Sequence, residues 1–306
     1  MIGSVGNVQR GIFSFICSIP SRGQELAVTN SVPDFDSRFR DGPEQLAAAK
    51  ADFTNFGFAV LRNAVDPQIV DAIAGYLRSE LSTATARVES ILEARGSTLR
   101  QGAPGTVSDL ELFSSGLNPD DASLVSGHFP LAVRLSATLR LICRSQTLLT
   151  FVKTVLECEQ LRMHLPPAAR FVLPHNRYAA VPAHQDVTYN KHIHGKFLTA
   201  WLPFVPIDEK CGGVAVYPGT CGNELTPRPR IEGFWYAGVE SGDQVPTHYP
   251  LHPGDALLLD PFVVHESFPN TSQTVRLSID FRFFPADVFS SKHFLDVASG
   301  AVVPPS

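Results

Sequence analysis

The sequence contains no CxxC pair, although it has five cysteines. They are odd in number and widely spaced: Cys17, Cys143, Cys158, Cys211 and Cys221. This pattern disfavours a zinc finger and a thioredoxin-type site, because both need closely paired cysteines. We expect reduced, mostly buried thiols, as in a cytoplasmic protein, and no disulfide.

The sequence also lacks the features of proteins that span membranes or bind nucleic acids. No apolar run reaches the roughly 18 residues of a membrane-spanning helix. The short run GIFSFICSIP has only Arg10 before it and no clean cleavage site, which disfavours a signal peptide. No basic block or stripe of basic and aromatic residues occurs, and the formal net charge is −5. We therefore expect a cytoplasmic location and neither a membrane nor a nucleic-acid partner.

What is present is the composition of a packed globular protein, with 44% hydrophobic residues in a chain of 306. Residues 1–40 show no sustained period and predict an extended arm. One domain is predicted over 41–290, with helical support in 41–160 and a β core over about 165–285. Residues 291–306 are expected to form a C-terminal tail.

The helical part carries clear start and stop signals. The segment PEQLAAAKADFTNF predicts a helix that Gly57 ends, and Asp66 is expected to cap a long helix with Pro67 at its first position. Residues 95–125 read as a long loop. Helical periodicity returns over 130–157 and predicts two helices.

The β part consists of short segments rich in β-branched and aromatic residues, separated by proline and glycine turns. Such closely spaced strands are typical of a sandwich or a jelly roll. The expected fold class is therefore α+β, with a mainly β core of jelly-roll, cupin-like type supported by N-terminal helices.

The stretch VPAHQDVTYN places His184 and Asp186 two positions apart on a predicted strand. Side chains at i and i+2 of a strand point the same way, so these two groups should aim at one point. An imidazole and a carboxylate placed like this can share a proton, form a buried hydrogen bond or bind a metal.

A second isolated histidine, His265, follows a Pro-Gly-Asp turn and a buried strand. The next strand alternates cleanly. One face carries apolar side chains, namely Val275, Leu277, Ile279, Phe281 and Phe283. The other face carries polar ones, namely Arg276, Ser278, Asp280 and Arg282. An arginine on the polar face of such a strand can bind an anion.

Two histidines and one carboxylate can occupy one face of a metal ion and leave other positions open. That ligand set suits Fe(II) oxygenases, although the ligand types leave Zn²⁺ open as well. Each of these residues alone is more often structural. Their order along the chain, with Arg276 on the strand after His265, is what favours a metal site.

The sequence resembles the phytanoyl-CoA dioxygenase branch of the Fe(II)/2-oxoglutarate-dependent oxygenases. The resemblance rests on His184-Gln185-Asp186, on PGDALLLDPFVVHES and PNTSQTVRLS, on GGVAVYPGT, and on FTNFGFAVLRNAVDPQIVDAI. It covers roughly residues 45–285, with an uninformative middle part.

This resemblance implies a double-stranded β-helix with Fe(II) bound by His184, Asp186 and His265. It further implies that Arg276 and Ser267 bind 2-oxoglutarate, which is consumed with O2 to give succinate and CO2. The pattern departs from the family at one place, because Glu266 replaces a small residue. Since Asp186 is present, oxygenation is favoured over halogenation.

Other residues carry weaker signals. Gln185 faces away from the predicted ligands, which fits a supporting role behind them. Tyr189 and Trp235 are candidates to contact a substrate. The histidines of KHIHGK, His192 and His194, are expected in a solvated loop.

The favoured function is hydroxylation of a small molecule, with specialised-metabolite biosynthesis as the context. The same iron site also serves desaturation, cyclisation, epimerisation or endoperoxide formation, and the sequence does not separate these outcomes. A cupin-like metal protein that does not use 2-oxoglutarate is the alternative from another class, but it gives Arg276 and Ser267 no task. A homodimer is left open.

Overall fold

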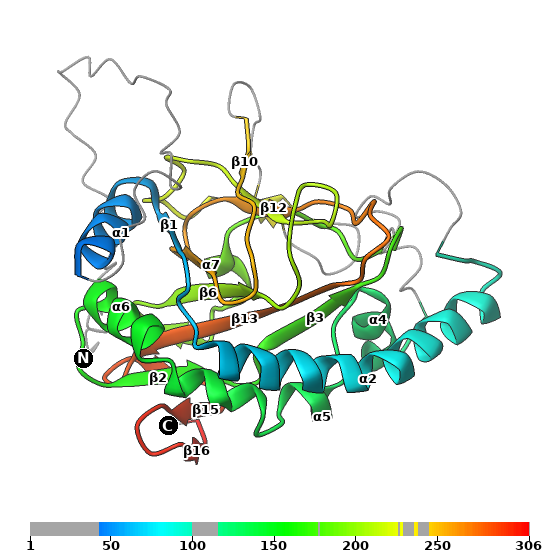
Figure 1. Cartoon of the computed structure of the whole chain (residues 1–306), viewed down its shortest axis with the longest axis horizontal. Helices are drawn as coiled ribbons and strands as arrows, with labels where there is room; N and C mark the ends of the chain where they lie inside the picture. The colour runs from blue at the N-terminus through cyan, green and yellow to red at the C-terminus, as the bar shows by residue number, and fades with distance from the viewer. Residues whose placement is uncertain are drawn as a thin grey trace, which may run out of the picture.

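Most of the helices precede most of the strands along the chain, as the sequence predicts (Figure 1). The computed structural model describes residues 43–99, 116–176, 178–225, 227–228, 236–237 and 245–305. The predicted arm and the substrate candidate Trp235 lie outside these residues. The helices are α1 (Pro43–Phe56), α2 (Pro67–Ala94), α4 (Pro119–Val125), α5 (Leu131–Arg134), the 3-10 helix η1 (Leu139–Arg144), α6 (Gln146–Leu156) and α7 (Asp186–Tyr189).

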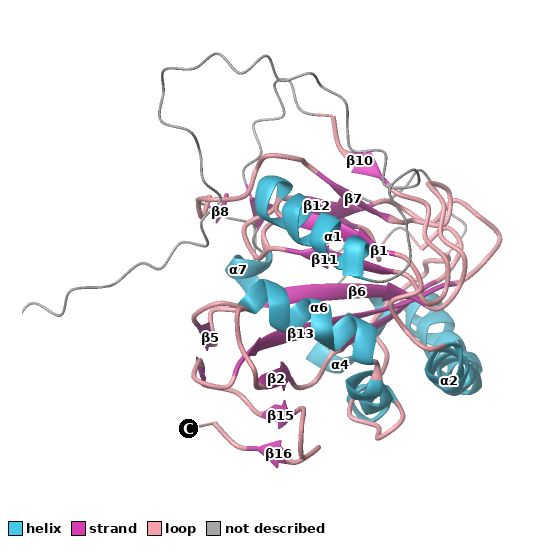
Figure 2. Ribbon diagram, turned by 60° about the vertical axis from the view of Figure 1, so that its left-hand side comes forward, coloured by secondary structure: helices cyan, strands magenta, loops and turns pink. Residues whose placement is uncertain are grey.

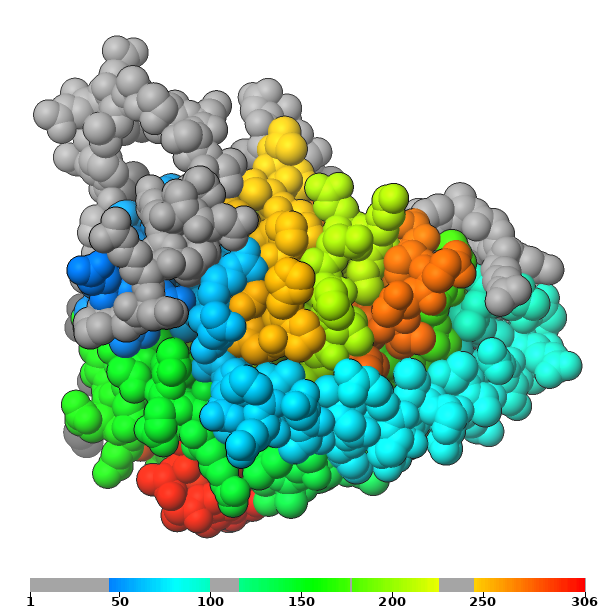
Figure 3. All heavy atoms as spheres, viewed as in Figure 1, coloured from blue at the N-terminus to red at the C-terminus, as the bar shows by residue number. Residues whose placement is uncertain are grey.

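The first two described helices begin and end at the residues that the sequence marks. The Asp66 carboxylate accepts a hydrogen bond from the Gln68 amide (2.8 Å), and Pro67 opens α2. Gly57 follows α1 with a φ of +78°, a conformation that glycine adopts without steric cost. In the space-filling view α2 forms a continuous band along one face of the molecule (Figure 3).

Two helical predictions are wrong in detail. The predicted loop over 95–125 ends in α4, which Asn118 caps by accepting from the Asp121 amide (2.9 Å). The two helices predicted over 130–157 are three shorter ones, α5, η1 and α6. Ser145 separates the last two and donates its hydroxyl to the Ala64 carbonyl (2.7 Å). The extended backbone of Ser145 (φ −74°, ψ 99°) is what interrupts the helical run.

The strands form two principal antiparallel sheets among the described residues. The larger contains β1 (Phe58–Leu61), β11 (Ala256–Leu259), β6 (Leu198–Pro203), β13 (Arg276–Pro285), β2 (Leu161–His164), β15 (Phe294–Asp296) and β16 (Val302–Val303), with β3 (Ala168–Val172) also paired to β13. The smaller contains β10 (Thr247–His248), β7 (Val214–Val216), β12 (His265–Ser267) and β4 (Val181–His184). Short pairs are β5 (Ile193–His194) with β14 (Phe289–Ser290) and β8 (Pro227–Arg228) with β9 (Tyr236–Ala237).

The two faces of the larger sheet pack against different partners (Figure 2). Side chains on one face join the helices in the main core; they include Leu202, Leu258, Leu277, Ile279, Phe281 and Phe283. Side chains on the other face pack towards β7; they include Phe58, Val60, Trp201, Leu257 and Leu259. The alternation of apolar and polar side chains predicted for residues 275–283 therefore gives β13 one face in the main core and one polar face.

Residues 291–306, which were expected as a tail, carry β15 and β16, and β15 pairs with β2 at the edge of the larger sheet. None of the helices that the structure describes is long and apolar enough to span a membrane. The four cysteines among the described residues form no disulfide with one another. The result is a mixed α/β architecture in which antiparallel sheets surround the polar face of β13.

Candidate active site

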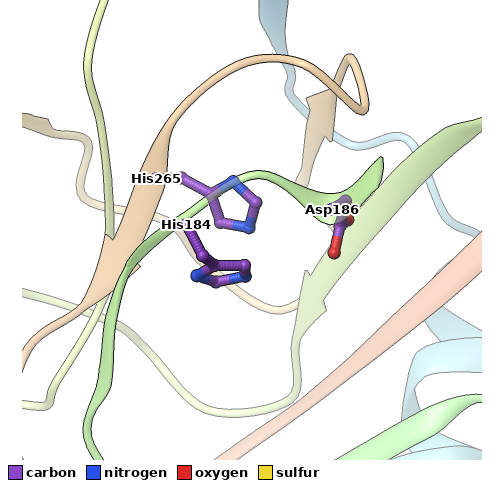
Figure 4. A group of neighbouring side chains, drawn as sticks. All are labelled: His184, Asp186 and His265. Atoms are coloured by element: carbon purple, nitrogen blue, oxygen red, sulfur yellow. The ribbon is translucent and has the colours of Figure 1, made fainter. Parts of the chain in front are cut away.

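The three predicted ligands converge on one point in the structure (Figure 4). His184 ends β4, and His265 lies directly opposite it on the antiparallel strand β12. Asp186 faces the two imidazoles, and one potential ligand atom from each residue lies within 4.8 Å of the others. All three side chains are buried.

Asp186 does not lie on the strand, as predicted, but is the first residue of the short helix α7. Gln185 between the two groups is extended, with φ −112° and ψ 134°. The alternation of an extended chain therefore continues through Gln185 and turns Asp186 to the side of His184. The prediction of a shared direction is right, although the secondary structure assigned to Asp186 is wrong.

Each histidine has one ring nitrogen fixed by a backbone carbonyl. Nδ1 of His184 lies 2.8 Å from the carbonyl oxygen of Pro182, and Nδ1 of His265 lies 3.1 Å from that of Val263. A carbonyl only accepts, so Nδ1 must carry the proton in both rings. The lone pair of Nε2 is left for a metal, in the arrangement that metal-binding histidines usually show.

Burial, and next the His265 ring, lower the pKa of His184 to about 3. His184 is therefore neutral at physiological pH, as metal ligation requires. Although burial raises the pKa of the Asp186 carboxyl, Arg282 and the two imidazoles outweigh this effect and hold it below its usual range. The site thus combines the neutral imidazole of His184 and the imidazole of His265 with one carboxylate.

Both oxygens of Asp186 have partners on the larger sheet that the sequence reading did not assign. Arg282 on β13 contacts Oδ1 (3.1 Å), and the Thr199 hydroxyl on β6 donates to Oδ2. Arg282 also lies 3.8 Å from Asp280. The signal for Arg282 was present, because it shares the predicted polar face with Arg276. Nothing in the sequence near Thr199 marks it.

Arg276 is 1% exposed and lines the same cavity as the three ligands. Its Nη1 donates to the Gly212 carbonyl, whereas Nε and Nη2 are buried and have no hydrogen-bond partner among the described residues. Burial, and next the nearby Arg170, lower the pKa of Arg276 to about 9, so it is still a cation at neutral pH. A buried cation with two free donors is suited to an anionic ligand.

The hydroxyl of Ser267, predicted beside Arg276, accepts from the Val181 amide (3.0 Å) and lines the cavity. Gly212, whose carbonyl holds Arg276, has a φ of +74°, and a Cβ there would lie 2.7 Å from the Phe268 carbonyl oxygen. A side chain at this position would therefore displace the loop that holds the arginine.

Gln185 braces the segment that carries the ligands. Its Nε2 donates to the carbonyls of Asn223 (2.9 Å) and Phe262 (2.6 Å), and its Oε1 accepts from the Leu225 amide (2.8 Å). Tyr189 ends α7, lines the cavity, and packs edge-on against His184 with ring centroids 5.1 Å apart.

The prediction of a solvated KHIHGK loop is wrong for His192. That side chain is buried and lies against His164, with 3.1 Å between its Nε2 and Nδ1 of His164. His194 is exposed, as expected. Both His192 and His164 line the cavity that the polar face of β13 borders.

The cavity has a volume of about 370 Å³ and reaches from the three ligands to Arg276. Besides β4, β12 and β13, the strands β2, β3 and β6 and the helix α5 contribute to its walls. The three predicted ligands, Arg276 and further space beside them therefore share one cavity.

A family comparison matches residues 53–278 to the phytanoyl-CoA dioxygenase (PhyH) family model. Among curated proteins, the 1-deoxypentalenic acid 11-beta-hydroxylase of Streptomyces arenae is 36% identical over 122 residues, which cover 34% of this chain and 41% of that protein. The peroxisomal phytanoyl-CoA dioxygenase of Bos taurus is 30% identical over 124 residues, covering 38% of this chain and 36% of that protein. The chain thus aligns with about two fifths of the length of these relatives.

Solved structures with a similar fold include the epimerase SnoN in complex with Fe3+, alpha ketoglutarate and nogalamycin RO. It matches with a TM-score of 0.51 and 19% identity over 81% of this chain and 87% of that chain. The apo form of the non-heme monooxygenase ThoJ matches with a TM-score of 0.51 and 16% identity, over 84% of this chain and 87% of that chain. At these identities the similarity shows a shared fold.

Proposed function

The chain belongs to the phytanoyl-CoA dioxygenase family, and we propose that it is an Fe(II)- and 2-oxoglutarate-dependent oxygenase that hydroxylates a C–H bond of a small molecule. The observation that carries the proposal is one cavity that holds both the His184, Asp186 and His265 cluster and Arg276, whose Nε and Nη2 have no hydrogen-bond partner among the described residues. Within this proposal the two antiparallel sheets form a double-stranded β-helix.

His184, Asp186 and His265 would hold the iron. The donor set fits, because both Nε2 atoms and an ionised carboxylate border one point, and this is the ligand set of non-haem Fe(II) oxygenases. When bound, Fe(II) supplies the activation of O2 that is coupled to the decarboxylation of 2-oxoglutarate to succinate and CO2.

Arg276 and Ser267 would hold the distal carboxylate of 2-oxoglutarate. Nε and Nη2 of Arg276 are buried and have no partner within the described part of the chain, and a carboxylate fits such a guanidinium edge with two parallel hydrogen bonds. The Ser267 hydroxyl accepts from the Val181 amide, so its own proton is free to reach the same anion. A cupin-like protein without 2-oxoglutarate would have no use for these donors.

The remaining chain residues would orient the ligands and exclude water. Arg282 and Thr199 fix both oxygens of Asp186, and Gln185 anchors the β4–α7 junction. Tyr189 lines the cavity beside His184 and is 39% exposed, so we assign it to the mouth, in contact with the substrate. The protein's contribution to the reaction is thus positioning and a dry, shaped site.

The context we propose is the biosynthesis of a specialised metabolite. The names of the Streptomyces relative, a hydroxylase, and of the SnoN epimerase refer to small organic molecules, and they favour such a substrate here as well. Hydroxylation is the outcome we propose among those that this iron site supports.

Two measurements test the function. Anaerobic protein reconstituted with Fe(II) should develop a visible metal-to-ligand charge-transfer band when 2-oxoglutarate is added. Mass spectrometry should then find succinate formation stimulated by metabolite fractions, together with a product that is 16 mass units heavier than its precursor. Absence of the charge-transfer band would contradict 2-oxoglutarate binding. Succinate formation with a product of another mass would contradict hydroxylation alone.

A further inference from the structure

Two cations from outside the strands that carry His184, His265 and Arg276 line the cavity, and neither belongs to the predicted metal ligands. Arg134 ends helix α5, and Lys292 lies between β14 and β15. Neither makes an ion pair within the part of the chain that the structure describes. No carboxylate of the described residues therefore contacts either cation, although Asp280 is near enough to act on Arg134, and both cations border the volume in which a substrate must lie.

The side chain of Arg134 and the backbone next to Lys292 are each bonded to a neighbouring carbonyl. Nε of Arg134 donates to the Pro167 carbonyl (2.9 Å), which leaves the two terminal nitrogens for another partner. The segment of Lys292 is attached to the cavity wall, because the Ser291 amide donates to the His192 carbonyl (2.9 Å). The fold thus fixes the direction of the Arg134 side chain and the position of the backbone that carries Lys292, whose own side chain is exposed.

The buried pair His164 and His192 lies in the field of these cations. The ring centroids are 4.2 Å apart. Burial is the main cause that lowers both pKa values, to about 2 for His164 and about 4 for His192, and Lys292 and Arg282 lower both further. Arg134 acts on His164 as well. Two neutral imidazoles and several cations therefore border the same part of the cavity.

The cavity lining carries more cations than carboxylates. The carboxylates already have partners: Asp186 and Asp280 lie beside Arg282, and Glu266 accepts from the Tyr217 hydroxyl (2.8 Å). The cations are Arg134, Arg170, Arg276, Arg282 and Lys292. In the proposed enzyme the charges of Fe(II) and of doubly ionised 2-oxoglutarate cancel, so this excess of positive charge persists when both are bound.

We propose that the substrate is an organic carboxylate whose carboxylate group is bound by Arg134 and Lys292, apart from the 2-oxoglutarate site at Arg276. This inference rests on the proposed oxygenase function. The terminal nitrogens of Arg134 suit an end-on carboxylate, and the ammonium of Lys292 adds a second charge from the opposite chain segment. The oxidised C–H bond then lies on the part of the molecule that extends towards His184 and His265.

The test compares benzoate with benzamide, which have nearly the same shape but differ in charge. Both are titrated by calorimetry and ligand-detected NMR against protein loaded with Zn²⁺ in place of iron and with saturating 2-oxoglutarate. We expect benzoate to bind at least about tenfold more tightly, as one charge-assisted contact implies. The double variant Arg134→Gln with Lys292→Gln should lose this preference while still binding benzamide.

Arg78→Gln with Lys50→Gln is the matched control, because both side chains are exposed on helices and lie outside the cavity. This variant should keep the preference for benzoate. Lys292→Gln alone alters an exposed side chain, so it reports on the site even if the Arg134 change impairs folding.

Three results would overturn the inference: no benzoate binding, equal affinity for the two probes, or a preference that survives the double variant. Competition between benzoate and 2-oxoglutarate would also overturn it, since both anions would then use one site. A parent protein that binds 2-oxoglutarate but does not distinguish the probes refutes the carboxylate substrate alone. A parent protein that fails to bind 2-oxoglutarate refutes the proposed function.

Discussion

Arg276 and Arg282 lie on the same face of β13, six residues apart, and differ in where their counter-charge comes from. Arg282 contacts the carboxylates of Asp186 and Asp280, whereas Arg276 bonds a single carbonyl and leaves Nε and Nη2 without partners among the described residues. Burial lowers both pKa values, but Asp186 and Asp280 reverse this effect at Arg282, so its pKa is raised while that of Arg276 falls to about 9.

The cavity therefore has two different ends. At the Asp186 end the protein itself supplies the counter-charge of the arginine, whereas at the Arg276 end a ligand must supply it. An unpaired buried charge is costly, and a fold keeps one where a ligand supplies the missing charge. The metal end is therefore preorganised by protein contacts, and the Arg276 end depends on its anion. Each of the following predictions tests one side of this comparison.

The largest effect is expected for Asp186→Ala, which removes a metal ligand and the counter-charge of Arg282 together. Fe(II) affinity should fall by at least about a hundredfold, hydroxylation should reach background, and the unpaired arginine should lower the free energy of unfolding by roughly 3 kcal/mol. Anaerobic Fe(II) titration, product analysis and urea unfolding measure the three effects. Asp71→Ala, at an exposed carboxylate on α2, is the control and should change none of them. Parent-like turnover in Asp186→Ala would show that the carboxylate is not a ligand.

The next largest effect is expected for Arg276→Ala. A charge-assisted contact in a partly dry site contributes roughly 1.5–3 kcal/mol, so 2-oxoglutarate should bind about ten- to a hundredfold more weakly. Arg276→Lys should recover only part of the loss, because an ammonium cannot contact both carboxylate oxygens in parallel. The charge-transfer band of the anaerobic Fe(II) protein gives the affinity. If Arg276→Ala titrates like the parent, the cosubstrate is held elsewhere in the cavity.

The sequence predicted the positions that repeat a local pattern and missed those that depend on distant packing. Asp66, Pro67 and Gly57 mark helix ends by local backbone chemistry, and the structure has those ends. The direction of Asp186 followed from the extended chain at Gln185, which is also local.

Thr199 and His192 were missed for the opposite reason. Their partners, Asp186 and His164, lie 13 and 28 residues away in the chain, and only the packing of separate strands brings them together. Arg282 is an intermediate case, because its face on β13 was predicted but its partner was not. A strand pattern gives the face on which a side chain lies, whereas its contacts require the tertiary fold.

A smaller effect is expected for Arg282→Gln. This variant should lose mainly Fe(II) affinity, whereas Arg276→Gln should lose mainly 2-oxoglutarate affinity. Without Arg282 the Asp186 carboxylate is less firmly oriented, so Fe(II) affinity should fall by about tenfold, as for other groups that orient metal ligands. The affinity for 2-oxoglutarate should change less. Arg276→Gln should instead weaken 2-oxoglutarate binding and spare iron. Titrations of Fe(II) and of 2-oxoglutarate against each variant give the four affinities. Equal losses of both affinities in the two variants would contradict separate roles for Arg276 and Arg282.

The smallest effect on ligand binding is expected at Asp260, a buried carboxylate outside the site to which the described residues give no cation. Its Oδ1 accepts only from the Phe262 amide (2.8 Å), and burial raises its pKa to about 7. Between pH 4 and 7 the folded chain holds a proton that the unfolded chain releases, so this group's contribution to stability falls as the pH rises through that window. Asp260→Asn keeps the hydrogen bond and removes the ionisation. Urea unfolding should therefore find that the stability of the variant relative to the parent increases by roughly 2–3 kcal/mol between pH 5 and pH 7.5. Asp71→Asn should show no such change. If the stability difference between Asp260→Asn and the parent is the same at both pH values, ionisation of Asp260 without a counter-charge does not affect stability.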